Sequence, residues 1–300
     1  MAAEDEPPSL AQVETVRAGT RDRIGGEGED RFDPRDVAKL MADDGFVARF
    51  WVHAFFIPGD RVENAVNLVI DTFKWRKDFG VNDITEADLD MEILERGSLY
   101  YHNRDKKGSR LLVFCIRKHN KDSKKMETMK KMLIYLLERL DKEEAGKRIT
   151  IIFDSEGAGL SNFDLEQVKF LIHVLISYYP NFVEKILVNI NCLVCICLNT
   201  DGCSGVRDAM DPEHRVEDHQ VAAAAPGRGQ DQVRHEEQHQ GGSLSLNHFH
   251  FNLVTVPQEL ISPDQLPVSW GGEDDWEFEA GLFLSRGSGA GKVRMRSSAK

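Results

Sequence analysis

Between residues 110 and 188, short apolar runs alternate with long runs of helical periodicity, and this alternation limits the possible folds more than any other feature. The runs RLLVFCIR (110–117), RITIIFD (148–154) and FVEKILV (182–188) are rich in branched and aromatic residues, as strands are. Between them lie residues 122–145, which repeat apolar positions at the spacing of an amphipathic helix, and residues 163–179. The run 163–179 is apolar over most of a helix circumference, so we expect that helix to be deeply buried. The order strand, helix, strand, helix, strand predicts an α/β fold, with a parallel or mixed sheet and crossover helices.

The first third of the chain predicts a small helical unit. Asp33 is placed to cap a helix that begins with Pro34, and residues 46–56 form a second apolar helical run. Asp60 is placed to cap a third helix, whose apolar positions recur up to residue 73. Residues 1–32 are polar and acidic and contain several glycines, so we expect them to be disordered or loosely attached.

Composition narrows the class of protein. Charged residues make up 29% of the chain and apolar residues 41%, as in an ordinary soluble globular protein. The net charge of −12 argues against a nucleic-acid partner, which would need a basic face. No apolar run reaches the roughly 18 residues that a membrane span requires, and the acidic start MAAEDEPP is unlike a signal peptide. We therefore expect a cytoplasmic location.

Several motifs, taken in order, resemble the Sec14-like or CRAL-TRIO lipid-binding family. The helical unit closes on FKWRKDFGV (73–81), and TIIFDSEGAGL (150–160) resembles the central strand of the family with its Asp-containing turn. YYPNFVEKILV (178–188) resembles the family's Tyr-Tyr-Pro helix end, and DQLPVSWGG (264–272) its closing motif. The match covers roughly residues 33–188 and 259–272. Within the family, the pattern DPRDVAKLMADDGFV (33–47) followed by WRKDFGVNDI (75–84) is most similar to the CRAL-TRIO half of the motile-sperm-domain-containing membrane proteins.

The resemblance implies a helical N-terminal unit followed by a CRAL-TRIO (Sec14-like) sheet with crossover helices. In this family the sheet forms the floor of a large apolar pocket, a mobile helix gates the pocket, and one lipid is held with its tails buried. The resemblance therefore implies a lipid ligand, a peripheral membrane partner at the endoplasmic reticulum or other internal membranes, and no cofactor beyond a bound lipid. It does not imply an enzyme, and no Ser/His/Asp or Cys/His arrangement is legible in the sequence.

Residues 189–258 depart from the family pattern, so the C-terminal part of the fold is expected to be incomplete. Read one nucleotide out of frame, Met210 and Asp211 must yield tryptophan, because ATG followed by G contains TGG. Permitted codons then let residues 205–221 read VYEMPWILNTAWKIIKS and residues 226–240 read QAVDKIKFVTKNSI, as the family requires. We interpret residues 188–204 and about 241–258 as retained introns that shift the reading frame and restore it. Such a chain would lack the gate helix.

The same segment contains four closely spaced cysteines, Cys192, Cys195, Cys197 and Cys203. A metal site is the alternative reading of this run, but no structural context in the sequence supports one, so we expect no metal. The histidines at 214, 219, 235, 239, 248 and 250 are interpreted as part of a low-complexity segment. Cys115 stands alone in a strand and is expected to be an inert buried thiol.

The candidate site residues are apolar side chains on the predicted strands and on the last buried helix. For each of them, ordinary core packing is the alternative to contact with a ligand. The candidate pocket wall consists of Leu112, Phe114, Ile116, Ile151, Phe153, Phe170, Val174 and Tyr178.

Polar candidates are fewer. Asp154 follows a strand and is expected to cap a turn rather than to act as a catalytic acid. The positive run Arg104, Lys106, Lys107 and Arg110 is a candidate membrane surface, with a solvated turn as the alternative. GSGAGK (287–292) lacks the spacing and context of a phosphate loop. Asn181 stands where phosphoinositide-binding members of the family carry an acidic residue, so phosphoinositide recognition is not expected.

The sequence therefore predicts six segments and one main function. The predicted function is binding of a hydrophobic lipid, and possible transfer of that lipid between membranes, impaired here by loss of the gate helix. The alternative is a ligand-free adaptor that binds proteins at membranes. The segments are a disordered N-terminus (1–32), the helical unit (33–90), the lipid-binding core (91–188), the aberrant segment (189–258), the closing family motif (259–272) and a disordered tail (273–300).

Overall fold

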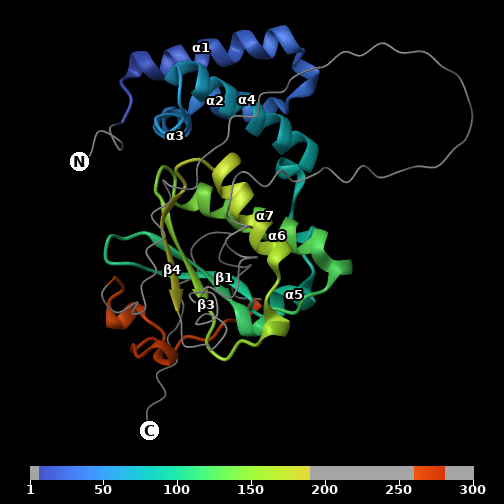
Figure 1. Cartoon of the computed structure of the whole chain (residues 1–300), viewed down its shortest axis with the longest axis vertical. Coiled ribbons are helices and arrows are strands. Elements are labelled where there is room, and N and C mark those ends of the chain that lie inside the picture. Colours follow the sequence, from blue (N-terminus) through green and yellow to red (C-terminus); the bar gives the residue numbers. More distant parts are fainter. Residues whose placement is uncertain (1–6, 190–259, 281–300) are drawn as a thin grey trace, which may run out of the picture.

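A computed structural model describes residues 7–189 and 260–280 of the chain. Figure 1 shows a group of N-terminal helices at one end and a sheet with its own helices at the other. The N-terminal helices are α1 (Leu10–Glu27), α2 (Pro34–Ala42), α3 (Asp44–Ala54) and α4 (Arg61–Phe79). The second part contains α5 (Met91–Glu95), β1 (Leu99–Arg104), β2 (Arg110–Cys115), α6 (Met126–Glu143), β3 (Ile149–Asp154), α7 (Leu165–Ser177) and β4 (Val183–Asn189).

Helix α1 corrects the expectation that residues 1–32 are disordered or loosely attached. Ser9 caps this helix through a capping box with Gln12, and Val13, Val16 and Ile24 are buried against the other helices of the unit. These apolar positions form a narrow stripe on an otherwise polar helix, so the average composition of the segment concealed it. Residues 10–27 are thus an integral part of the helical unit.

The helix starts that the sequence predicts at Asp33 and Asp60 are confirmed. The carboxylate of Asp33 accepts the backbone N–H of Arg35, and Pro34 is the first residue of α2. The carboxylate of Asp60 accepts the backbone N–H of Glu63 at 2.8 Å, which starts α4. Helix α4 then runs through the WRK stretch to Gly80, which ends it in a left-handed conformation (φ 72°).

The four described strands form one mixed sheet in the order β1-β2-β3-β4. Strands β2, β3 and β4 are parallel, as the crossover helices α6 and α7 require, and their positions match the three predicted apolar runs. Strand β1 is antiparallel to β2 and was not predicted. Only Leu99 and Tyr101 of β1 are buried, and the polar stretch from residue 102 to residue 109 made the hairpin look like a turn.

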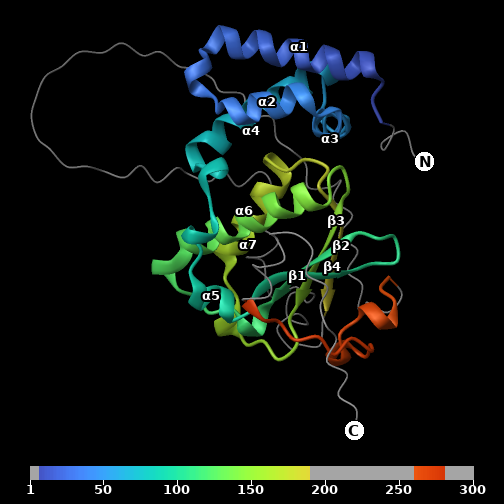
Figure 2. The same cartoon turned by 180° about the vertical axis from the view of Figure 1, so that it is seen from behind.

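The sheet buries a different set of residues on each face. Leu112, Phe114 and Ile151 belong to a large cluster with α6 and α7, which cover this face in Figure 2. Val113, Ile152 and Leu187 belong to a smaller cluster on the opposite face. Because side chains alternate along a strand, the two sets follow from the two-residue period of β2, β3 and β4. A sheet buried on both faces explains why these strands read as continuous apolar runs.

Residues 260–280, which we call the C-terminal strap, pass from one face of the sheet to the other. Ile261, Leu266 and Trp270 fill the smaller cluster, whereas Phe278 packs against the larger one. Between them Trp276 stacks on His102 of β1, with ring centroids 3.8 Å apart. The expectation of a disordered tail from residue 273 onward is therefore wrong for residues 273–280, which dock on β1 through aromatic contacts.

Candidate functional site

The candidate pocket wall begins as two rows of apolar side chains across the sheet. Leu112 of β2 pairs with Ile151 of β3, and Phe114 of β2 pairs with Phe153 of β3. Residues paired in register on parallel strands point to the same face, so all four side chains face α6 and α7. The rings of Phe114 and Phe153 stack with centroids 5.0 Å apart. Together these side chains make a continuous apolar floor.

Helix α7 and the end of α4 supply the other wall of the candidate site. Phe170, Val174 and Tyr178 recur at intervals of four residues, so they lie along one side of α7 and its C-cap. Phe170 stacks on Phe79 at 6.1 Å between centroids. Tyr178 stacks on Trp75 at 4.1 Å. The contribution of α4 was not predicted, because the contact joins segments that are about 100 residues apart.

All eight predicted wall residues lie in or against one apolar cluster, but their exposure differs. Leu112, Ile151 and Val174 are fully buried, and Phe114 is 7% exposed. The remaining residues, Ile116, Phe153, Phe170 and Tyr178, are only partly buried at the edge of that cluster. The structure thus separates an inner group, which packs against protein, from an outer group with free surface. Within the described residues, the outer group is the part of the wall that keeps exposed apolar surface.

Asp154 and Cys115 sit together at the carboxyl ends of β3 and β2. The carboxylate of Asp154 accepts the backbone N–H of Glu156 at 3.2 Å, which confirms the predicted role in capping the turn. The thiol of Cys115 lies 3.8 Å from the other oxygen of Asp154. Burial, with the nearby negative charge, raises the pKa of the Cys115 thiol, so this cysteine has little thiolate character.

The predicted membrane surface maps to the hairpin between β1 and β2, where carboxylates balance most of its charge. Arg104 forms a two-pronged ion pair with Glu144, and Arg110 lies 3.4 Å from the same carboxylate. Lys107 pairs with Glu184 at 2.7 Å. Lys106 is exposed and its backbone N–H bonds to the carbonyl oxygen of Leu260. This hairpin is therefore a weak source of positive potential.

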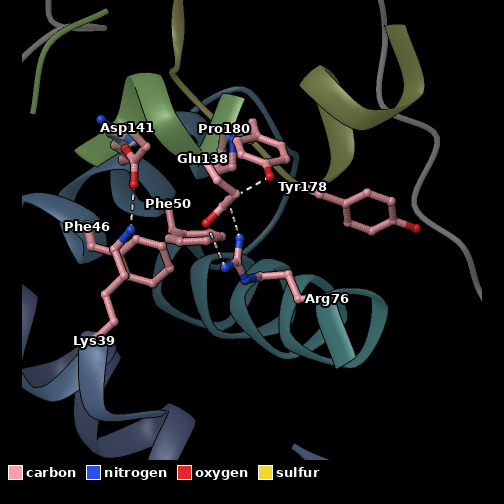
Figure 3. Close-up of a pocket in the computed structure, with 10 residues that line it drawn as sticks. Lys39, Phe46, Phe50, Arg76, Glu138, Asp141, Tyr178 and Pro180 are labelled. Carbon is pink, nitrogen blue, oxygen red and sulfur yellow. Dashed lines mark hydrogen bonds and ion pairs between the residues drawn. The ribbon is translucent and has the colours of Figure 1, made fainter. Parts of the chain in front are cut away.

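A second polar feature joins the helical unit to the sheet domain (Figure 3). Glu138 of α6 receives two hydrogen bonds from the guanidinium of Arg76 and one, at 2.6 Å, from the hydroxyl of Tyr179. Asp141, one turn further along α6, pairs with both Lys39 and Arg49. The cations come from α2, α3 and α4, so two carboxylates on one helix hold three helices of the helical unit.

These buried charges stabilise one another. Burial alone would raise the pKa of Glu138, but the charge and hydrogen bonds of Arg76 outweigh burial and hold that pKa below its usual range. Burial and the Glu138 carboxylate raise the pKa of Tyr179 well above its ordinary value, so the phenol stays protonated and donates. Asp36, which also contacts Arg76, has a raised pKa because its burial outweighs the same guanidinium.

The cavity at this junction is about 20 Å³, which is room for roughly one water molecule. Lys39, Arg76, Glu138 and Tyr178 are among the residues that line it, and Figure 3 shows the ring of Tyr178 pointing away from the ion pairs. A ligand pocket for even a drug-sized molecule needs about 300 Å³ or more. The junction is therefore a polar connection between the two parts of the chain, distinct from the apolar wall.

Several predictions lie outside the described residues. Residues 188 and 189, the expected start of the aberrant segment, belong to β4 and pair with β3. The rest of that segment, its cysteine cluster and the six histidines fall in residues 190–259, and GSGAGK falls in residues 281–300. Within 7–189 and 260–280, no group of three or more His, Cys, Asp or Glu side chains is arranged to hold a metal ion. Over the same ranges, no helix has both the length and the apolar character to cross a bilayer. Asn181, after the Tyr-Tyr-Pro stretch, adopts a left-handed turn (φ 51°) that asparagine tolerates.

The sheet domain is similar to a known protein family. Residues 94–193 match the family model described as "CRAL/TRIO domain". The match begins in α5 and runs through β1, β2, α6, β3, α7 and β4, so it contains the strands and the α7 side chains of the candidate wall. Residues 94–193 are therefore similar to a CRAL/TRIO domain over the strands and helices that form the candidate wall.

A solved structure described as "Crystal structure of Sfh5" is also similar to this chain. The sequences are 16% identical, the TM-score is 0.36, and the alignment covers 46% of this chain and 54% of that chain. The chain thus spans about half the length of the matched structure.

Proposed function

We propose that this chain binds one hydrophobic lipid against the helix-covered face of its sheet and moves that lipid between membranes. The observation that carries the proposal is the separation of the wall into two groups. A packed inner group of side chains supports an outer group of half-buried apolar side chains, all within the segment that matches the CRAL/TRIO domain. Ile116, Phe153, Phe170 and Tyr178 form the outer group and are the proposed ligand contacts.

The binding energy in this proposal comes from apolar burial and not from chemistry on the ligand. Each CH₂ group of a lipid tail that leaves water contributes about 0.8 kcal/mol, so a tail of ordinary length supplies ample affinity without a charged anchor. The titratable groups nearest the wall do not suggest catalysis: Cys115 has a raised pKa, and Asp154 caps a turn. We therefore propose a binding and transfer protein without an enzymatic step.

Mass spectrometry of organic extracts tests this proposal. The purified chain should release a stoichiometric lipid, and the variant Phe170→Ser should retain much less, because serine removes apolar contact from the outer group. Phe46→Ser is the matched control, since Phe46 is a half-buried ring of the helical unit that meets Phe50 edge to face and stacks on Phe73. The proposal fails if the unmodified chain yields no lipid and transfers none between vesicles.

We also propose that transfer is impaired in this chain because the gate helix is missing. This proposal is supported by the sequence alone, because residues 190–259 lie outside the described part of the chain. Read in the shifted frame, that segment resembles the family sequence that contains the gate helix. Sequencing of transcripts across codons 187–206 and 240–260 tests this directly. If mature transcripts lack the two inserted segments, the protein in the cell has a complete gate and this proposal of impairment is wrong.

We propose a cellular location from the finer resemblance to motile-sperm-domain-containing protein 2. It supports a cytoplasmic domain held peripherally at the endoplasmic reticulum or other internal membranes. Fractionation of cells that express the chain tests this, because a peripheral protein is released from the membrane pellet by high salt. Full recovery in the cytosolic fraction at low salt would contradict it.

A ligand-free adaptor is the second candidate function, and the packing of the inner group favours it. Leu112, Ile151 and Val174 are fully buried by protein, so these three side chains offer no surface to a ligand. An adaptor of this fold would yield no lipid on extraction but would still bind its protein partner. The extraction experiment therefore distinguishes the two candidates.

A further inference from the structure

The loop between β2 and α6 and the first turns of α6 are strongly basic in an otherwise acidic chain. Residues 117–131 contain seven lysine or arginine residues and two carboxylates, a local charge of +5, whereas the whole chain carries −12. The segment follows strand β2 at its carboxyl end and begins directly after Ile116 of the apolar wall. We call residues 117–131 the basic segment.

Most cations of the basic segment are exposed and not balanced by carboxylates. Lys125 pairs with Asp90 and Glu92, and Lys130 pairs with Glu127. The other five cations have no carboxylate within ion-pair distance in the described part of the chain. These five exposed residues are Arg117, Lys118, Lys121, Lys124 and Lys131. Their potential is therefore available to an external anion, unlike that of Arg104, Lys107 and Arg110 in the hairpin.

The basic segment is held in place by the rest of the fold. The side-chain amide of Asn162 donates to the carbonyl oxygens of His119 at 2.8 Å and Arg117 at 3.3 Å. The carboxylate of Asp122 accepts the backbone N–H of Lys124 at 3.0 Å. These bonds fix the loop backbone, so the cations are displayed from a preorganised surface, which lowers the entropic cost of binding.

Two exposed aliphatic side chains flank the cations. Met91 of α5 is 43% exposed and Leu165 of α7 is 40% exposed. The ion pair of Lys125 with Asp90 places Met91 beside the basic segment, and the 3.9 Å approach of Lys130 to Glu166 places Leu165 on its other side. Figures 1 and 2 both show α5 beside the start of α6. Exposed apolar groups among cations are typical of surfaces that lie on a bilayer.

We propose that the basic segment, with Met91 and Leu165, is the surface by which this chain docks on a bilayer rich in anionic phospholipids. The five free cations meet the phosphate and serine headgroups, and the two aliphatic side chains enter the boundary between headgroups and tails. This docking surface adjoins the proposed lipid-binding wall, because Lys130 lies over the ring of Phe170 at 5.3 Å from its centroid. The two proposals rest on different side chains, so either can hold without the other.

The observations favour a bilayer over a nucleic acid. The flanking side chains are aliphatic, so they can enter a lipid interface but offer no aromatic platform for bases. The charge of −12 on the whole chain also repels a long polyanion, whereas a planar membrane meets only the face turned toward it. Screening limits each interaction to about 8–10 Å at ordinary ionic strength, so a planar membrane interacts mainly with the five free cations on the face turned toward it.

Sedimentation with vesicles tests the proposal on the full chain. The probes are vesicles of phosphatidylcholine alone and of phosphatidylcholine with phosphatidylserine. The test variant is Lys118→Gln/Lys121→Gln/Lys124→Gln, and the control is Arg21→Gln/Arg23→Gln/Lys142→Gln, which removes the same charge from exposed positions elsewhere. We expect the chain to bind only the serine-containing vesicles, the test variant to bind them at least tenfold more weakly, and the control to bind like the original. Added salt should release the bound chain.

Three results would overturn the proposal. The first is equal binding of the chain to both kinds of vesicle. The second is an equal loss in the test and control variants, which would mean that net charge and not this surface controls binding. The third is tighter binding to a short RNA or DNA duplex than to the vesicles, lost in the test variant. Circular dichroism of both variants confirms that they fold, and lipid extraction reports on the binding wall independently of docking.

Discussion

The indole ring of Trp75 lies flat against the phenol ring of Tyr178, with centroids 4.1 Å apart and an angle of 6° between the planes. Trp75 belongs to α4 of the helical unit, and Tyr178 follows α7 of the sheet domain. The same indole stacks on Phe79, and Phe79 stacks on Phe170, so the aromatic contacts form a ladder between the two helices. This ladder joins the helical unit directly to the candidate lipid-binding wall.

We therefore expect Trp75→Ala to destabilise the chain by about 2–4 kcal/mol, because it removes a large apolar surface together with two stacked pairs. Trp75→Phe should recover part of that loss, since a smaller ring can still stack. Urea denaturation followed by circular dichroism measures both values. A loss below about 1 kcal/mol for the alanine variant would show that the two parts are held together by other contacts.

A second prediction concerns Asp141, whose carboxylate pairs with Lys39 and Arg49 across the junction. Asp141→Asn should cost about 3 kcal/mol at neutral pH, because it leaves two partly buried cations without their partner. Glu127→Gln, on the exposed side of the same helix, is the matched control and should change stability little. Equal effects of the two variants would contradict the role assigned to the junction.

The same carboxylate predicts a pH dependence. Burial would raise the pKa of Asp141, but Arg49 and Lys39 outweigh it and lower that pKa below 3.8 in the folded chain. A lowered carboxyl pKa contributes stability that is complete above the unfolded value and is lost as the pH falls through the folded value. Denaturation curves from about pH 5 downward should therefore fall more steeply for the original chain than for Asp141→Asn.

His53 is expected to change the stability of the chain over a different pH range. Its side chain is buried in the helical unit, its Nε2 atom has no hydrogen-bond partner, and burial lowers its pKa from 6.5 to about 4. The unfolded chain takes up the proton first, so stability is complete above pH 6.5 and falls as the pH drops toward 4, by up to about 1.4 kcal/mol per pH unit.

Replacement of His53 by leucine should remove this contribution. The difference in unfolding free energy between His53→Leu and the original chain should grow in favour of the variant as the pH falls from 6.5 to 4. Because the measurement is a difference, the contributions of His119 and His173, whose pKa values are also lowered by burial, cancel. A difference that stays constant over this range would show that His53 is already accessible to protons in the folded chain.

The C-terminal strap gives a fifth prediction. Trp276 contacts His102 and Tyr100 of β1, and Asp274 accepts a hydrogen bond from the side chain of Asn103 at 2.8 Å. Trp276→Ala should release the strap from β1 and speed protease cleavage within residues 271–280. Val268→Ala, at a position that is 57% exposed, should leave the cleavage rate unchanged. Cleavage at the original rate in both variants would mean that the strap is held elsewhere.

The sequence predicted those elements whose pattern is local. Strands β2, β3 and β4 and helices α6 and α7 are continuous runs of strong periodicity, and the caps at Asp33 and Asp60 depend on neighbouring residues only. Helix α1 was missed because its apolar stripe is narrow. Strand β1 was missed because its second half, residues 102–104, is polar and does not show the apolar alternation of a strand.

The candidate site was predicted only in part, for a related reason. The eight wall residues were identified because each belongs to a predicted strand or helix, and they do come together in one cluster. Trp75 and Phe79 were not identified, because nothing in α4 indicates which distant helix it will meet. The ion pairs of Arg104 and Arg110 with Glu144 could not be predicted either. The partners are about 35–40 residues apart in sequence, and only the folded sheet brings them together.

The smaller cluster under the sheet has a consequence for how the chain is made. Its strand residues are Val113, Ile152 and Leu187, and the last of them leaves the ribosome about seventy to eighty residues before Ile261 and Leu266, which cover the cluster. At roughly 5–20 residues per second, that face of the newborn sheet stays open for about 4–15 seconds. During this interval an apolar surface is available to chaperones or to another nascent chain. The yield of folded protein in a cell therefore depends on whether a chaperone or another nascent chain binds that surface before synthesis is finished.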